Sequence, residues 1–362
     1  MSDGARFARP SLEQLPPSDP TPLLASGAVS LGLNEGANGP FPAALAAMAE
    51  ALPGLNRYPG RGSFELVAAL SERHKVAPEQ VLVAAGADAV IGYVCQAALE
   101  AGDEVIVAWP SFPSFVRDSH KRDATVVPVP LVGGSVDLAA IGDAVTSRTK
   151  LLFLATPNNP TGRLIPRDDL VSFVCGLPEH VLPVIDEAYF DYLDPVDRLD
   201  TIDDLLRAGN DVLALRTFSK LYGLAGLRVG YGVGPTAVIS AMRKVQRGYD
   251  VGRLCQVAAL ASLGDADEVE RRRLENLAAV AALTALLQSH GLEPLAGSAA
   301  NFVFVDVGID AGEAGAELLD NGVSVQTGTP YGAPTALRIS AGSASELALL
   351  DAALRACSFS AG

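Results

Sequence analysis

A short stretch of the sequence carries side chains suited to a molecule with both a carbonyl and a phosphate group. Ser219 and Lys220 follow the apolar run Val212–Leu215, which predicts a buried strand, and Arg228 comes eight positions after Lys220. A lysine amine forms a Schiff base with a carbonyl, and an arginine beside a hydroxyl binds phosphate. Taken alone, the sequence around Lys220 is equally typical of an ordinary surface lysine after a strand. The surrounding elements must decide between these two interpretations.

These elements alternate regularly. Helical patterns occur at about 87–100, 112–120, 137–144, 167–175 and 201–208. Short runs of valine, isoleucine and leucine predict strands at 81–84, 104–107, 125–129, 150–154, 181–185, 212–216 and 228–232. The alternation predicts an α/β fold whose mostly parallel, seven-stranded sheet is covered by helices on both faces.

The pattern changes after residue 234. Helices are expected at 235–247, 252–262 and 265–290, followed by strands at 301–306, 323–326 and 336–340 with helices at 311–320 and 345–356. This part predicts a small α+β domain that the N-terminal segment joins. We therefore expect an N-terminal arm and part of the small domain over residues 1–50, a large domain over 51–250 and the rest of the small domain over 251–362. Residues 1–28 predict a loosely held arm.

Chemically useful residues follow five of the predicted strands. Ligands of open parallel sheets bind beyond the carboxyl ends of the strands, so these residues would share one site. Small residues that open a helix leave backbone N–H groups free for a phosphate. The groups are a Gly86–Asp88 turn with Ala87, the aromatic Phe112, the amide Asn159, the acid Asp186 with the phenol Tyr189, and Lys220 after Ser219.

Together these groups predict a site for pyridoxal 5'-phosphate (PLP). A buried aspartate, here Asp186, keeps the pyridine nitrogen protonated and makes the ring an electron sink. The amide of Asn159 and the phenol of Tyr189 would hold the phenolic oxygen of the ring. Lys220 would bind the cofactor and, once displaced by substrate, move the proton of the substrate Cα. That role requires a lowered pKa, which partial burial and cationic neighbours would produce.

Three motifs carry a resemblance to a known family. Asn158–Gly162, Asp186–Tyr189 and Thr217–Arg228 together resemble the motifs of fold-type I PLP-dependent enzymes. The resemblance is to the branch of histidinol-phosphate and aromatic amino acid aminotransferases, and it extends from about Leu33 to Leu354. It implies a PLP-dependent transferase fold of type I and an aminotransferase (transaminase) activity of amino-acid biosynthesis.

The same resemblance implies how the cofactor is held. Lys220 would form the Schiff base, Asp186 would contact the pyridine nitrogen, and Phe112 would stack on the ring where many relatives carry tyrosine. Asn159 and Tyr189 would contact the phenolic oxygen. The residues implied for the phosphate are Ala87, Asp88, Ser219 and Arg228, with Tyr58 reaching it from the partner subunit of a homodimer.

Three residues are implied on the substrate side: Arg338, Asn34 and Gln326. Arg338 would bind the α-carboxylate in a bidentate fork. At Gln326 the sequence departs from the family pattern, because many histidinol-phosphate enzymes have an arginine there that is expected to bind the substrate phosphate. We therefore expect either an aromatic amino acid or histidinol phosphate as donor, with the motifs closer to the aromatic enzymes. The acceptor would be a 2-oxo acid such as 2-oxoglutarate.

Other functions fit the sequence to different degrees. A PLP-dependent decarboxylase of the threonine-phosphate kind, or another PLP enzyme of secondary metabolism, would use the same scaffold and stays open. A regulator with an aminotransferase-like domain is disfavoured, because no helix-turn-helix pattern precedes residue 30. A nicotinamide dehydrogenase is also disfavoured, because Gly230–Gly234 lacks the G-x-G-x-x-G pattern.

The composition restricts the partners. A net charge of −15 argues against a nucleic-acid surface, which needs concentrated lysine and arginine. The four cysteines and four histidines show no ligand spacing, so we predict no metal site. No apolar run is long enough to span a bilayer. We expect a cytoplasmic protein with small-molecule substrates and no membrane or nucleic-acid partner.

Overall fold

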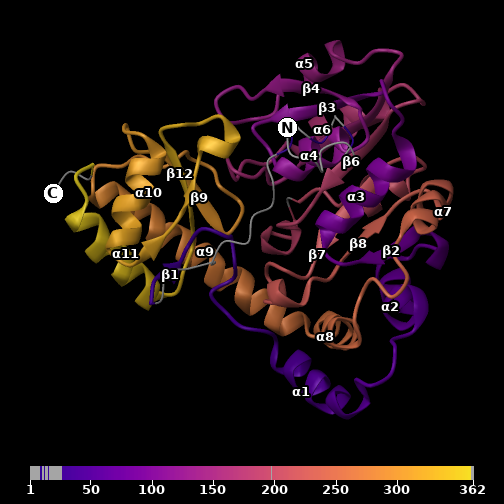
Figure 1. Ribbon diagram of the computed structural model, residues 1–362, viewed down its shortest axis with the longest axis horizontal. Coiled ribbons are helices and arrows are strands. Elements are labelled where there is room, and N and C mark those ends of the chain that lie inside the picture. The colour runs from indigo at the N-terminus through magenta and orange to yellow at the C-terminus, as the bar shows by residue number, and fades with distance from the viewer. Residues whose placement is uncertain (1–8, 10–11, 13–14, 16–26, 197, 360–362) are drawn as a thin grey trace, which may run out of the picture.

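The computed structural model describes residues 9, 12, 15, 27–196 and 198–359 (Figure 1). The predicted arm over residues 1–28 lies mostly outside them. Figure 1 shows a large lobe built around one sheet, a smaller lobe at the C-terminal end of the chain, and a long helix, α9, running between the two.

The large lobe contains a seven-stranded sheet with the order β2-β8-β7-β6-β5-β3-β4. The strands are β2 (Val81–Ala84), β3 (Glu104–Trp109), β4 (Thr125–Pro130), β5 (Thr149–Ala155), β6 (Leu182–Asp186), β7 (Leu213–Thr217) and β8 (Gly230–Val233). Strands β3 to β7 pair in parallel, whereas β8 is antiparallel to both β7 and β2. The chain between β7 and β8 contains only the 3₁₀ turn Ala225–Leu227 and no crossover helix, so β8 returns antiparallel. The predicted α/β fold with a mostly parallel sheet is confirmed.

Helices cover both faces of this sheet because its strands are apolar on both sides. Val105 and Val107 of β3 belong to one core cluster, whereas Ile106 between them belongs to another. Successive side chains of a strand point to opposite faces, so a continuous apolar run needs a cover on each. The helices of this lobe are α1 (Pro42–Ala51), α2 (Phe64–His74), α3 (Ala87–Ala98), α4 (Pro113–His120), α5 (Leu138–Asp143), α6 (Arg167–Cys175), the π-helix Thr201–Leu206 and α7 (Thr236–Val245).

The smaller lobe has two short sheets. The N-terminal strand β1 (Val29–Ser30) pairs in parallel with β10 (Val323–Ser324). Strands β11 (Gln326–Thr327), β12 (Ala336–Ser340) and β9 (Phe302–Asp306) form an antiparallel sheet in that order. The expected single strand over 323–326 is therefore wrong: it is split at Val325, because its two halves pair with different partners.

Of the remaining helices, the first packs on the large lobe and the other three join the two lobes or cover the smaller one. They are α8 (Arg253–Leu263), α9 (Ala266–Ser289), α10 (Ala311–Asp320) and α11 (Ala344–Ala356). A third core cluster combines Leu31 with Leu283, Val303, Leu337 and Leu350, so residues from both ends of the chain share one core. Helix α8 packs against α1. The domain boundaries after residues 50 and 250 stay predictions.

Two further features concern possible partners. Among the helices of the described residues, none is long and apolar enough to cross a membrane. The same part of the chain contains no group of three or more histidine, cysteine, aspartate or glutamate side chains placed to hold a metal ion. Two of the histidines form side-chain hydrogen bonds: His74 with Tyr231, and His290 with Asp351.

Candidate active site

A cavity of about 430 Å³ lies between the large sheet and the small antiparallel sheet. The predicted site residues that line it are Asn34, Ala87, Asp88, Phe112, Asn159, Asp186, Tyr189, Ser219, Lys220, Arg228, Gln326 and Arg338. Tyr58 is the exception among the predicted residues. It is 81% exposed, and its ring stacks on Tyr249 with the ring centroids 4.6 Å apart. Its predicted contact with a partner subunit's cofactor stays a prediction.

Strand pairing explains how residues distant in the sequence converge. Asp186 closes β6 and pairs with Ala155 of β5 on one side and Leu215 of β7 on the other. The parallel strands therefore end at one edge of the sheet, where the loops after them meet. On the opposite wall, Gln326 of β11 stands directly across from Arg338 of β12. The cavity thus has one wall from each sheet.

Asp186 is a buried carboxylate on the floor of the cavity. Its Oδ1 accepts a hydrogen bond of 2.9 Å from the backbone N–H of Ala188. Burial raises the pKa of Asp186 to about 7, since water no longer stabilises the charged form. A buried carboxylate is stable only with hydrogen-bond donors or positive charge nearby. A protonated ring nitrogen would supply such a donor, so the acid fits the role predicted for it.

Lys220 lies beside this acid, in the turn after β7. Its Nζ donates a hydrogen bond of 3.1 Å to the backbone oxygen of Leu33 and lies 5.8 Å from the centroid of the Tyr189 ring. Burial, and then the positive charge of Arg338, lower the pKa of Lys220 to about 8. The amine is therefore closer to its neutral, nucleophilic form at neutral pH than an ordinary lysine would be.

A second set of contacts holds the phenol of Tyr189. Its oxygen accepts a hydrogen bond of 2.9 Å from Nδ2 of Asn34, and burial raises the pKa of Tyr189 to about 12. The backbone N–H of Asn34 in turn donates to Oγ of Ser340 in β12 at 2.9 Å. The phenol therefore stays protonated at neutral pH and is tied, through Asn34, to the strand that carries Arg338.

Arg338 is buried, and its guanidinium is already partly bonded. It donates to Oδ1 of Asn159 at 2.6 Å, to the phenolic oxygen of Tyr331 at 2.8 Å and to the backbone oxygen of Gly32 at 2.6 Å. Within the described part of the chain, its Nε is buried without a hydrogen-bond partner. An unpaired donor on a buried guanidinium fits an incoming carboxylate, which the planar fork of arginine binds well.

The start of α3 forms a pocket suited to an anion. Gly86 precedes it with φ +88°, a backbone conformation that favours glycine, and a Cβ at this position would lie 2.8 Å from Nη2 of Arg228 and so crowd the guanidinium. Nη1 of Arg228 donates to Oγ of Ser219 at 3.2 Å, and Oγ1 of Thr217 donates to the same oxygen at 3.0 Å. A helix N-terminus beside an arginine and hydroxyls is the donor set that a phosphate needs.

The contact of Asp88 with a phosphate stays a prediction, and its carboxylate is hydrogen-bonded within the protein. Its carboxylate faces α4, where it accepts hydrogen bonds from Oγ of Ser114 and from Nη2 of Arg117. A carboxylate repels a phosphate, so only the backbone N–H groups at this end of α3 suit that ligand.

Sequence reasoning missed Ser114, Arg117 and Tyr331, all of which line the cavity. Ser114 and Arg117 lie one helical turn apart just after Phe112, a weak signal, and Tyr331 lies in a short turn with no periodicity.

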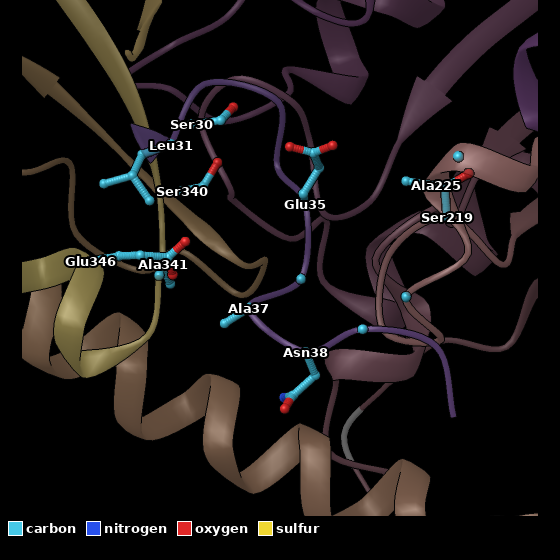
Figure 2. Close-up of a pocket in the computed structure, with 15 residues that line it drawn as sticks. Ser30, Leu31, Glu35, Ala37, Asn38, Ser219, Ala225, Ser340, Ala341 and Glu346 are labelled. Atoms are coloured by element: carbon cyan, nitrogen blue, oxygen red, sulfur yellow. The ribbon is translucent and has the colours of Figure 1, made fainter. Parts of the chain in front are cut away.

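A neighbouring cavity of about 350 Å³ adjoins the site at Ser219 (Figure 2). The segment with Glu35 and Asn38 runs through its middle, between Ser219 on one side and Ser340 on the other (Figure 2). Nδ2 of Asn38 donates to the side chain of Glu275 on α9 at 2.9 Å. The N-terminal segment therefore lines both cavities: Glu35 to Gly39 line the neighbouring one, and Leu33 and Asn34 line the candidate active site.

Comparison with known proteins agrees with this geometry. Residues 26–356 match the family model "Aminotransferase class I and II". Aromatic amino acid aminotransferase of Mycobacteroides abscessus is 40% identical over 302 residues, which cover 83% of this chain and 85% of the relative. The enzyme of the same name from Mycobacterium tuberculosis strain H37Rv is 41% identical over 303 residues, with 83% and 85% covered.

Solved structures are similar as well. A crystal structure of histidinol-phosphate aminotransferase from Sinorhizobium meliloti, in complex with pyridoxal-5'-phosphate, has a TM-score of 0.83 and 32% sequence identity, and the match covers 90% of each chain. Aspartate aminotransferase from Thermus thermophilus with maleate has a TM-score of 0.78 and 28% identity, covering 91% of this chain and 90% of that one. With its site, its fold and these relatives in agreement, the chain belongs to the class I and II aminotransferase family.

Proposed function

We propose that this aminotransferase uses PLP to move an amino group from an aromatic amino acid to a 2-oxo acid such as 2-oxoglutarate. The observation that carries the proposal is the shared cavity of Lys220, Asp186, Tyr189 and Arg338. A reactive amine, a buried acid, a phenol and a carboxylate-binding arginine are the groups that amino-acid chemistry on this cofactor needs. The 40% identity to an aromatic amino acid aminotransferase supports the donor class.

Each residue has a distinct task in this proposal. When bound, PLP supplies a ring that withdraws electrons from the substrate Cα. Asp186 holds a proton on the ring nitrogen, while Tyr189 and Asn159 orient the ring through its phenolic oxygen. Phe112 stacks on the ring face. The N-terminus of α3, with Arg228 and Ser219, binds the phosphate.

The substrate side of the site is served by two residues. Arg338 binds the α-carboxylate with its guanidinium fork and so sets the orientation of the bonds at Cα. Lys220, with its lowered pKa, would take the proton from the substrate Cα and would return it to the cofactor carbon that is bonded to the amino nitrogen. The buried surroundings of Asp186 and Arg338 keep water away from this proton transfer.

The distal wall favours an uncharged donor side chain. Leu33 and Tyr331 contribute apolar surface to the cavity, and Gln326 contributes an amide that also donates to the backbone oxygen of Thr327 at 3.1 Å. Histidinol phosphate is the second candidate donor, because a structural relative at 32% identity is a histidinol-phosphate aminotransferase. Gln326 lacks the charge that would bind its phosphate.

A half-reaction tests the proposal. The PLP-loaded protein is mixed separately with phenylalanine, tyrosine, histidinol phosphate and phosphothreonine, without an acceptor. We expect phenylalanine or tyrosine to yield its 2-oxo acid in an amount equal to the cofactor, with loss of the visible absorption of the cofactor. Release of carbon dioxide from phosphothreonine alone would favour a decarboxylase instead. A protein that cannot be loaded with PLP would refute both.

Replacing Gln326 with arginine should shift the donor preference. The added charge would stand beside Arg338 and meet a phosphate at the distal end of the substrate. We expect kcat/KM for histidinol phosphate to rise about tenfold or more, because a charge-assisted hydrogen bond is worth roughly 1.5–3 kcal/mol. Gln288→Arg, on the far part of α9, is the control for added charge. An unchanged preference would mean that position 326 does not meet the distal end of the donor.

The pKa of Lys220 predicts how the cofactor-free protein takes up PLP. Only the neutral amine attacks the carbonyl, so the rate should rise with pH until the amine is fully deprotonated. We expect a rise of about tenfold per pH unit and a plateau above the pKa of about 8. Stopped-flow absorbance at a series of pH values measures this, with the Lys220→Ala protein as background. A rise that continues to about pH 10 would indicate an ordinary lysine.

We also propose that the active form is a homodimer in which Tyr58 reaches the cofactor phosphate of the partner subunit. Its support is that Tyr58 is exposed and is not among the residues that line the cavity of its own chain, while its ring stacks on Tyr249. Sedimentation equilibrium of the full chain tests the assembly: a monomer at micromolar concentration would exclude this role for Tyr58.

A further inference from the structure

Asp88, Ser114 and Arg117 form a polar clamp between the first turns of α3 and α4. Oγ of Ser114 donates to Oδ1 of Asp88, and Nη2 of Arg117 donates to both oxygens of the same carboxylate, at 3.1 and 3.3 Å. Nη2 of Arg117 also donates to Oγ of Ser114 at 2.8 Å, so the three side chains are mutually bonded. All three line the candidate active site.

Because of the position of Asp88, this clamp affects how well the N-terminus of α3 can bind an anion. Asp88 is the second residue of α3, directly after Ala87, in the turn whose backbone N–H groups suit a phosphate. An unpaired carboxylate a few ångströms from a phosphate would weaken binding, because two negative charges in a partly buried site repel strongly. Within the described residues, Arg117 is the one cation that hydrogen-bonds to Asp88.

The other charged residues near Arg117 do not take over its contact with Asp88. Asp118, the next residue of α4, also accepts from Nη2 of Arg117 at 3.1 Å, but Nζ of Lys121 contacts it at 2.7 Å. When Arg117 is removed, Asp118 is still paired with the ammonium of Lys121. Among the described residues, Asp88 is then left with the hydroxyl of Ser114 as its side-chain hydrogen-bond donor. Arg228 is bonded to Ser219 on the other side of the α3 terminus.

We propose that Arg117 neutralises Asp88 and thereby lets the N-terminus of α3 accept the phosphate of the cofactor. Arg117 acts through Asp88 and is a positioning residue: it does not contact the phosphate itself. The clamp also fixes the start of α4, where Phe112 stands, against α3. This inference rests on the proposed function, because the phosphate in question is that of PLP.

The test compares PLP with pyridoxal, which has the same ring and carbonyl but no phosphate. Dissociation constants are measured by equilibrium dialysis on the cofactor-free full chain, for the wild type, Arg117→Gln, Arg117→Lys, Asp88→Asn and the double variant Asp88→Asn/Arg117→Gln. Arg355→Gln, which loses an exposed arginine of an ion pair on α11, is the control for lost charge. Circular dichroism verifies that each variant is folded.

We expect Arg117→Gln to raise the dissociation constant for PLP about tenfold and that for pyridoxal less than about twofold. The double variant should return to within about threefold of the wild type, and Arg117→Lys should also stay within about threefold. Asp88→Asn alone should bind PLP at least as tightly as the wild type. The last variant decides the matter if Arg117→Gln does not fold.

Several results would overturn the inference. An equal loss of PLP and pyridoxal in Arg117→Gln would mean that Arg117 positions the ring and has no electrostatic role. No loss, no recovery in the double variant, or weaker PLP binding by Asp88→Asn would contradict the neutralisation of Asp88. Failure of the proposed function is distinguishable, because the wild type would then bind neither PLP nor pyridoxal.

Discussion

Replacing Lys220 with alanine is expected to lower the turnover of the PLP-loaded enzyme by about 10⁴-fold or more, because one side chain both binds the cofactor and moves the substrate proton. The geometric basis is the position of its amine, 3.1 Å from the backbone oxygen of Leu33 and above the ring of Tyr189. Turnover is measured as 2-oxo acid formed from phenylalanine or tyrosine with 2-oxoglutarate. The visible absorption that the cofactor acquires on the lysine should disappear as well.

A lysine elsewhere provides the matched control. Lys244 is exposed on α7, away from the cavity, so Lys244→Ala should leave both turnover and the absorption spectrum unchanged. Added methylamine should restore part of the turnover of Lys220→Ala, which would show that the missing amine, and not a misfolded site, causes the loss. Turnover of Lys220→Ala within about tenfold of the wild type would contradict the role of this lysine.

Replacing Asp186 with asparagine should lower kcat by about 10³-fold, with a smaller effect on KM. The amide has almost the same volume and can still accept the N–H of Ala188, which donates to Asp186 at 2.9 Å in the wild type. What is lost is the negative charge that would hold a proton on the ring nitrogen. The measurement is the steady-state rate with a saturating donor, together with the affinity for PLP.

The control for this substitution is an aspartate whose charge has no such task. The side chain of Asp168 is 96% exposed, and its Oδ1 lies 3.6 Å from Nη1 of Arg167. Asp168→Asn should therefore have no measurable effect on kcat. Asp186→Glu keeps the charge and should retain more activity than Asp186→Asn. If Asp186→Asn and Asp186→Glu were equally active, the charge at this position would not be what the reaction uses.

Much of the fold and of the site follows from local patterns. Short apolar runs marked the central strands of the large sheet, such as β3 and β5, because a strand buried on both faces is apolar along most of its length. The residues just after these strands could then be assigned to one edge of the sheet. This is why Asp186, Lys220 and Asn159 were expected together, although Asn159 and Lys220 are 61 positions apart, and why they line one cavity.

Other features depended on how separate elements pack. The sequence contains Asp88, Ser114 and Arg117, but only the packing of α4 against α3 brings the carboxylate of Asp88 into contact with Ser114 and Arg117. Tyr331 joins the site because a turn of the small lobe brings its phenol within 2.8 Å of Arg338. The first contact joins residues 29 positions apart, and the second depends on how the turn before β12 folds back on that strand, so no helix or strand periodicity encodes either.

The sequence by itself determined which chemical groups stand at the strand ends, because burial and strand length impose a pattern that can be read one segment at a time. Only the tertiary structure decided where their side chains point and which partners they bond. That outcome depends on the relative positions of helices and of the two sheets, as with Asn34, which links Tyr189 to Ser340 across the cavity. The physical reason is that a side chain's direction and its pKa depend on all the atoms packed around it.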